Sequence, residues 1–391
     1  MHATQRHPSA VMRGAAWPTL AVALLWGLLP QLMLARDSLA CGPTHQQDLA
    51  ASLRETVRTM FYHGYDNYMA HAYPRDELCP LSCTGRDTWG PFALTLVDTL
   101  DTLVVLGNYS EFARAAQMVA RRLDFDIDRN VSVFETNIRM LGGLLSAHLL
   151  AAQLTSGGDN KADDMGPGPS PLPTVAGWDY QGELLRLAVD LADRLLPAFD
   201  TPTGIPYGTV NLRHGVPRAE TVITSLAGGG THIVEFGLLS RLTRDPKYEM
   251  AAKGAMRALW ALRSDIGLPG NHIDIESGYW TLKDASIGPN ADSWYEYLLK
   301  GYVLLDEPEY ISMFQDTYRA VNRYMKHQHW YIDVNMVTGN PSIPWFTALG
   351  AFWPGLQVGR QLPACELVAA RSGLSCQSMT PVFQSRQLFN N

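Results

Sequence analysis

Apolar residues recur at helical spacing along most of this chain, and this periodicity limits the fold to an assembly of α-helices. The spacing predicts helices at residues 49–70, 91–106, 111–124, 132–153, 181–197, 231–243, 247–263, 292–305 and 308–326. Residues 270–280 alternate and turn at Ser277-Gly278, which predicts a short hairpin, and residues 331–336 predict a further strand. Paired helices with hairpins favour an α/α toroid. An α-solenoid is the alternative, although no repeat of fixed length supports it.

Composition and charge fit a globular protein. The 391 residues are 46% hydrophobic and 18% charged, enough for a large core, and one helical barrel can account for the whole length. The net charge of -7 argues against a nucleic-acid partner, because no basic stripe is present to neutralise phosphates. Residues 156–176 are rich in Gly, Pro and Asp, which predicts a flexible insert between helices rather than a domain boundary.

One carboxylate lies inside the apolar, small-residue segment 132–153. Burying an ionised Glu135 is costly unless the charge is paired or used. Arg139 lies one helical turn further along the same face, so an ordinary helix ion pair is one interpretation, and spacing alone favours it. The other interpretation is catalytic, because a glutamate in a partly apolar site has a raised pKa that suits a general acid.

The chain also carries seven segments in a recognisable order. They are AHAYPRDEL (70–78), LTLVDTLDTL (94–103), SVFETNIR (132–139), LPAF with TGIPY (196–207), IVEF with LSRLT (233–243), DSWYEYLLK (292–300) and FWPGLQ (352–357). Together they resemble glycoside hydrolase family 47, the class I α1,2-mannosidases, and within it the ER degradation-enhancing α-mannosidase-like branch. The resemblance covers residues 54–358. It implies an all-α fold, an (α/α)₇ barrel that is incomplete here, with short β-hairpins at one end.

The resemblance also implies roles for particular residues in an inverting hydrolysis. Glu135 and Asp292 match catalytic carboxylates, Glu135 as the acid. Asp292 begins a predicted helix, where the helix dipole is expected to lower its pKa, and an ordinary N-cap is the alternative. By resemblance, Arg139, Glu235, Asp98 and Asp101 line the sugar pocket; the alternative for the two aspartates is a pair of charges in the first turns of a helix.

Beyond Val358 the resemblance stops, and residues 359–391 predict an unrelated, disordered tail. The resemblance implies a Ca²⁺ cofactor, but it places the threonine that holds Ca²⁺, and the second catalytic glutamate, in a part of the family domain that finds no match here. The expectation is therefore that this chain has no complete metal site and is inactive by itself.

The N-terminus predicts entry into the secretory pathway. Basic Arg6 and Arg13, an apolar run and small residues form a signal peptide over 1–40, leaving 41–358 as the partial barrel. An uncleaved membrane anchor is the alternative, although Pro18 and Pro30 keep the apolar run short. Five cysteines leave at least one thiol without an intramolecular partner; Cys83 matches a family cysteine whose partner has no counterpart here, which suggests a luminal thiol oxidoreductase as a partner.

Two functions are consistent with these features. The first, implied by the resemblance, is an α1,2-mannosidase of the endoplasmic reticulum lumen that trims high-mannose N-glycans of misfolded glycoproteins during ER-associated degradation. The second is a catalytically inactive protein that binds mannose or misfolded clients through the same cavity. An unrelated α/α toroid of the prenyl-transferase kind would need zinc ligands, and the sequence lacks them at suitable spacing.

We expect the chain to enter the endoplasmic reticulum and to be glycosylated on at least one of Asn108 and Asn130, which begin Asn-X-Ser sequons. Digestion with endoglycosidase H should increase gel mobility, and replacing both asparagines by Gln should remove the shift. Unchanged mobility of the parent chain, with protease sensitivity of the whole chain in intact microsomes, contradicts both expectations.

Overall fold

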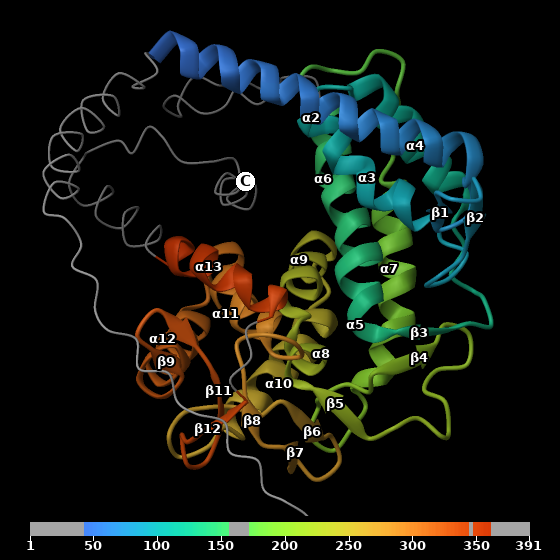
Figure 1. The fold of residues 1–391 in the computed structure, drawn as a ribbon. Helices are drawn as coiled ribbons and strands as arrows, with labels where there is room; N and C mark the ends of the chain where they lie inside the picture. Colours follow the sequence, from blue (N-terminus) through green and yellow to red (C-terminus); the bar gives the residue numbers. More distant parts are fainter. Residues whose placement is uncertain (1–42, 156–171, 344–346, 361–391) are drawn as a thin grey trace, which may run out of the picture. The chain divides into compact units, whose positions relative to one another are not determined.

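The computed structural model describes residues 43–155, 172–343 and 347–360 (Figure 1). The chain divides into two compact units, Met1–Gly64 and Tyr65–Asn391. Helix α2, Pro43–His71, begins in the first unit. The predicted signal peptide, residues 156–171 of the insert and residues 361–391 of the tail lie outside the described residues. Within the described ranges, no helix combines the length and apolar character that a membrane crossing requires.

Helices of the second unit pack in consecutive pairs, as Figure 1 shows. The paired helices are α3 (Leu94–Val105) with α4 (Tyr109–Arg122), α6 (Gly142–Thr155) with α7 (Glu183–Leu195), α9 (Ile233–Thr243) with α10 (Lys247–Ala261), and α11 (Asp292–Leu305) with α12 (Pro308–Tyr324). The first member of each pair also contacts the first member of the next, so α3, α6, α9 and α11 form an inner row. This double layer confirms the predicted all-α class.

Apolar side chains account for the packing of the inner row. Leu100, Leu144, Phe236 and Leu298, one from each inner helix, are fully buried. Gly107 follows the end of α3 with φ +78°, a left-handed conformation that glycine adopts without strain, and α12 begins at Pro308 as the sequence predicts.

Short strands and helices connect the pairs. The antiparallel sheets are β1 (Glu77–Cys79) with β2 (Thr84–Arg86), β3 (Asn130–Ser132) with β4 (Thr209–Asn211), β5 (Ile223–Ser225) with β6 (His272–Asp274) and β7 (Trp280–Leu282), β8 (Asp284–Ala285) with β11 (Asp333–Asn335) and β12 (Pro341–Ile343), and β9 (Lys326–His327) with β10 (Trp330–Tyr331). The short helical elements are α5 (Val133–Glu135), η1 (Thr136–Leu141), η2 (Leu196–Phe199), α8 (Leu226–Gly230), η3 (Ala348–Phe352) and α13 (Trp353–Gly359). The hairpin predicted at 270–280 is present as β6 and β7.

The helix predicted over residues 132–153 is present without a break from Val133 to Thr155, as α5, the π-helical turn η1 and α6, and only its first residue is wrong. Ser132 ends strand β3, where it pairs with Thr209. Periodicity missed this because the apolar pattern is continuous, whereas the strand pairing comes from a partner far along the chain. Single π turns inside helices frequently occur at functional sites.

The two sequon asparagines differ in their surroundings. Asn130 is exposed at the start of β3, and its side-chain oxygen accepts a hydrogen bond of 2.8 Å from Asn211 Nδ2. Asn108 is half-buried and caps α4, with its Oδ1 accepting from the backbone of Glu111 at 3.2 Å. Glycosylation of either residue stays a prediction, and the greater exposure of Asn130 favours it as the acceptor.

Asp76, fully buried, organises the loop that leads into α3. One of its oxygens accepts the backbone N–H of Thr88, Trp89 and Gly90, at 3.2, 3.0 and 2.9 Å. Its other oxygen accepts the N–H of Phe92 and Leu94, at 3.0 and 3.2 Å. A carboxylate with this many charge-assisted bonds holds residues 88–94 in one conformation.

We expect Asp76→Asn to lower the free energy of unfolding by about 2–4 kcal/mol, because an amide group would turn donors toward backbone N–H groups and leave them without acceptors. Urea unfolding followed by circular dichroism measures the change. Asp316→Asn is the control: its partner Arg319 is solvent-exposed, and such pairs contribute about 0–1 kcal/mol. Equal stability of the two variants would show that Asp76 does not hold the loop.

Candidate functional site

The segment with Glu135 enters its helix at a capped turn. Ser132, at the end of β3, accepts the backbone N–H of Glu135 at 3.2 Å, an N-cap bond that fixes the first turn of α5. The helix then continues as the π-helical turn η1, which contains Asn137 and Arg139. The capped turn thus places a carboxylate, an amide and a guanidinium within five residues.

Glu135 and Arg139 form the expected ion pair. Arg139 Nε donates to Glu135 Oε2 at 2.8 Å, and the guanidinium lies 5.9 Å from the ring centroid of Trp89, on the loop that Asp76 holds. The side chain of Glu135 is 23% exposed to solvent, so a ligand can reach its carboxylate although the carboxylate is paired with Arg139. The ion pair that the structural interpretation predicts is therefore present, and Glu135 is still exposed enough for the catalytic interpretation.

Two aspartates of α3 lie on the same side. Asp98 is accessible, yet desolvation raises its pKa; the charge of Arg139 opposes this, and the charges of Asp101 and Glu135 add to it. Asp101 accepts a hydrogen bond of 3.0 Å from Ser146 on α6. Asp98 therefore belongs to the electrostatic surroundings of Arg139, and the charge of Asp101 acts on Asp98.

Glu235 is buried on α9 and is held by two donors. Asn137 Nδ2 donates to its Oε2 at 2.7 Å, and the hydroxyl of Tyr297 donates to its Oε1 at 2.6 Å. Both bonds favour the ionised carboxylate, but desolvation has the larger effect and raises the pKa of Glu235 to about 7. The carboxyl group can therefore change its protonation state near neutral pH.

Asp292 is connected to Glu235 through hydrogen-bonded neighbours. The Asp292 carboxylate accepts the backbone N–H of Ser293 at 2.9 Å, and the Ser293 hydroxyl lies 2.8 Å from that of Thr231. The Thr231 carbonyl accepts from Asn137 Nδ2 at 3.0 Å, and the same nitrogen bonds Glu235. These bonds join η1, α9, α11 and the turn between α8 and α9 into one polar network.

The expected lowering of the Asp292 pKa is wrong, and the alternative interpretation of Asp292 as an N-cap is not supported either. The residue is the first of α11, but the N-cap is Ala291, and no side chain caps this helix. Desolvation raises the pKa of Asp292, and the charge of Glu296 adds to the effect, so burial outweighs the helix dipole that was expected to lower it.

The structure thus divides the predicted site residues into two groups. Glu135 and Asp98 lie in the field of the Arg139 guanidinium, and the charge of Asp101 acts on Asp98, whereas Glu235 and Asp292 share the polar network. Sequence reasoning missed Asn137, Tyr297, Thr231, Ser293 and Trp89. Asn137 and Tyr297 lie inside recognised motifs, but nothing local shows that they bond Glu235, since 98 and 62 residues separate them from it.

The described residues do not assemble an obvious metal site. Calcium prefers six to eight oxygen ligands. Within residues 43–155, 172–343 and 347–360, no three His, Cys, Asp or Glu side chains come together as a metal would require. No chemical step is therefore assigned to the calcium that the family resemblance implies.

Comparison with known proteins gives consistent matches. The family model described as "Glycosyl hydrolase family 47" matches residues 60–369. ER degradation-enhancing alpha-mannosidase-like protein 2 of Homo sapiens is 49% identical over 338 residues, which cover 86% of this chain and 55% of that protein. Alpha-mannosidase I MNS4 of Arabidopsis thaliana is 52% identical over 311 residues, 80% of this chain and 47% of that protein. The chain spans about half the length of the curated relatives it matches.

A solved structure supports the same fold. An alpha-1,2-mannosidase from Trichoderma reesei superimposes with a TM-score of 0.67 and 26% sequence identity, covering 80% of this chain and 64% of that one. The two proteins therefore share a fold, although only 26% of their aligned residues are identical.

We expect the stability of the protein to fall, relative to that of Glu235→Gln, as pH rises. The pKa of Glu235 is about 7 in the folded state and near its ordinary value in the unfolded state, so the stabilising proton is fully bound below the ordinary pKa and is lost as pH rises toward 7. Since one pKa unit corresponds to ~1.4 kcal/mol, the difference between the two proteins should change by about 2–4 kcal/mol. Urea unfolding of both proteins at pH 5 and pH 7.5 measures it; a constant difference contradicts the raised pKa.

Proposed function

Because the chain belongs to glycosyl hydrolase family 47, we propose that its carboxylate site takes part in removing α1,2-linked mannose from high-mannose N-glycans of misfolded glycoproteins in the lumen of the endoplasmic reticulum. The relatives named as ER degradation-enhancing mannosidase-like proteins support the cellular role, and the fungal alpha-1,2-mannosidase supports the bond that is cut. The observation that carries the proposal is an accessible Glu135 beside Arg139, next to a buried network that ends at Asp292.

Glu135 suits the role of proton donor. In the proposed reaction, its carboxyl group gives a proton to the glycosidic oxygen, directly or through a water molecule, while the bond from that oxygen to the anomeric carbon breaks. Arg139 orients the carboxyl group through the 2.8 Å bond to Oε2 and leaves Oε1 as the oxygen that can face the sugar. The aromatic face of Trp89 limits where the guanidinium can move.

Asp292 suits the role of the second carboxylate. An inverting hydrolysis needs a base that takes a proton from the attacking water on the opposite face of the sugar, and the new bond forms at the anomeric carbon as the old one breaks. Desolvation raises the pKa of Asp292, which makes it a stronger proton acceptor than an exposed aspartate. Its bond from the Ser293 backbone holds one oxygen in place.

Glu235, Asp98 and Asp101 fit the binding of sugar hydroxyls. Carboxylate oxygens accept hydrogen bonds from hydroxyl groups, and Asn137 and Tyr297 hold Glu235 in one orientation. In this proposal the network positions the substrate and Glu135 performs the proton transfer.

Thiol exchange is a further part of the proposal. Cys83 is exposed at the turn between β1 and β2, and neither Cys79 nor Cys83 forms a disulfide within the described ranges. An exposed thiol in an oxidising compartment fits the suggested luminal oxidoreductase partner.

In a full-length version of the protein, which would carry the second catalytic glutamate that the family resemblance implies, we expect Glu135→Gln to reduce the rate of mannose release by about 10²–10⁴-fold, the usual loss when a general acid is removed. The assay incubates the purified protein with a high-mannose N-glycan and follows the products by chromatography. The control is Glu276→Gln, an exposed glutamate in the turn between β6 and β7, which should leave the rate unchanged.

The same assay separates hydrolysis from binding alone. Equal rates for the parent and Glu135→Gln would show that Glu135 is structural. If the full-length parent retains the glycan in an affinity measurement but releases no mannose, the protein is a mannose-binding protein and the hydrolytic proposal fails.

A further inference from the structure

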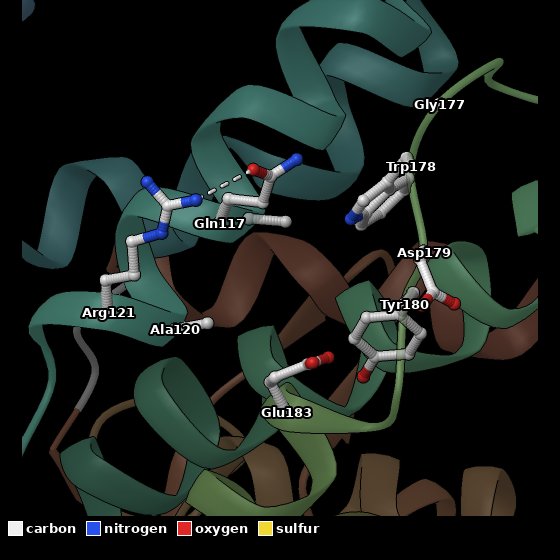
Figure 2. Close-up of a pocket in the computed structure, with 9 residues that line it drawn as sticks. Gln117, Ala120, Arg121, Gly177, Trp178, Asp179, Tyr180 and Glu183 are labelled. Carbon is white, nitrogen blue, oxygen red and sulfur yellow. Dashed lines mark hydrogen bonds between the residues drawn. The ribbon is translucent and has the colours of Figure 1, made fainter.

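A pocket with a volume of about 290 Å³ opens on the outer side of the helix pairs, apart from every residue of the carboxylate site. Figure 2 shows α4 on one side, with Gln117, Ala120 and Arg121, and the segment Gly177–Glu183 on the other. The volume is near the lower end for small-molecule sites. No catalytic or substrate-binding role proposed above involves these residues.

Two aromatic rings form one wall of the pocket. The centroids of Trp178 and Tyr180 lie 5.6 Å apart with ring planes inclined by 50°. Phe112 packs edge-on against Trp178 at 5.6 Å, and the Tyr180 hydroxyl lies 2.8 Å from His148 Nδ1. Because its hydroxyl is already bonded inside the protein, Tyr180 offers the pocket its ring and not its polar end.

The backbone of this wall is held in place. Gly177 and Gly182 have φ of +76° and +78°, left-handed conformations that favour glycine, and they bracket the aromatic segment. Val175, just before it, donates to the carbonyl of Leu154 on α6 at 3.1 Å. The backbone that carries the Trp178 and Tyr180 rings is therefore held in one conformation, and a ligand that binds there loses little free energy to ordering the protein.

The polar groups of the pocket are mixed in sign and partly neutralised. Glu183 accepts the backbone N–H of Gln181 at 3.0 Å and faces Arg186 at 3.8 Å, and Asp179 accepts from the side chain of Gln181. Across the pocket, Arg121 Nη2 lies 3.4 Å from Gln117 Oε1, which leaves the amide nitrogen and further guanidinium N–H groups available as donors.

This arrangement selects a class of ligand by elimination. An anion would meet two carboxylates, and a cation would meet Arg121 and carboxylates that already have donors. A purely apolar ligand would leave the polar groups without partners. A sugar ring satisfies all of them, since its C–H face packs on aromatic rings while its hydroxyls both donate and accept.

We propose that the pocket between α4 and Gly177–Glu183 binds a neutral saccharide, as a second sugar site outside the carboxylate cluster. The inference of a saccharide ligand rests on the residues of this pocket and does not depend on the hydrolytic function proposed above. If that function holds as well, a second sugar site would keep a glycoprotein near the carboxylate cluster by raising its effective concentration.

The test follows the indole N–H signals of the protein by NMR after ¹⁵N-tryptophan labelling. The chain has 10 tryptophans, and the Trp178 signal is identified by its loss in Trp178→Phe. The probes are α1,2-mannobiose, diacetylchitobiose, and an N-acetyl-lysine amide as a cation. We expect a saturable shift of the Trp178 signal with a neutral saccharide and none with the cation. The signal of the exposed Trp330 should not shift and serves as the internal control.

Two variants locate the binding. Ala120→Leu fills the pocket from α4, and Arg121→Ala removes a donor from an exposed position, so folding should survive at least one of them. Each should raise the Kd by about tenfold or more, the loss of roughly one good contact. Glu135→Gln should leave the Trp178 response intact, which separates this site from hydrolysis. No response to either saccharide, a response to the cation alone, or an unchanged Kd in both variants overturns the proposal.

Discussion

The buried carboxylate of Asp76 is the interaction on which one half of the carboxylate site depends. Its two oxygens accept five backbone N–H groups between Thr88 and Leu94, and it thereby fixes the path of the chain into α3. Trp89, which contacts Arg139, lies inside this loop, and α3 carries Asp98 and Asp101. Asp76 thus determines where Trp89, Asp98 and Asp101 lie. In another path of residues 88–94, buried backbone N–H groups would lose their acceptors and destabilise the fold.

The other half of the site depends on a polar network inside an apolar helix layer. Glu235, Asn137, Ser293 and Asp292 come from three elements, and Thr231 lies between α8 and α9, so each hydrogen bond restricts how those elements can pack. Such networks are costly when partly satisfied, and Asn137 Oδ1 is buried with no hydrogen-bond partner among the residues that the structure describes.

The carboxylate site and the outer pocket differ in the interactions that each would offer to the sugar proposed for it. The former relies on desolvated carboxylates whose pKa values are raised, as at Glu235 and Asp292, which suits proton transfer and strong orientation. The latter relies on aromatic faces and balanced donors and acceptors, which suits binding without chemistry.

The sequence by itself determined the helical class, most element positions and the motif that contains Glu135, because these depend on periodicity and local capping. The end of α3 at Gly107 and the start of α12 at Pro308 are examples in which one residue is sufficient. Only the tertiary structure decided that Ser132 ends a strand, that Tyr297 bonds Glu235, and that burial raises the pKa of Asp292 against its helix dipole. The reason is physical: strand pairing, long-range hydrogen bonds and desolvation are set by atoms distant along the chain, which no local pattern contains.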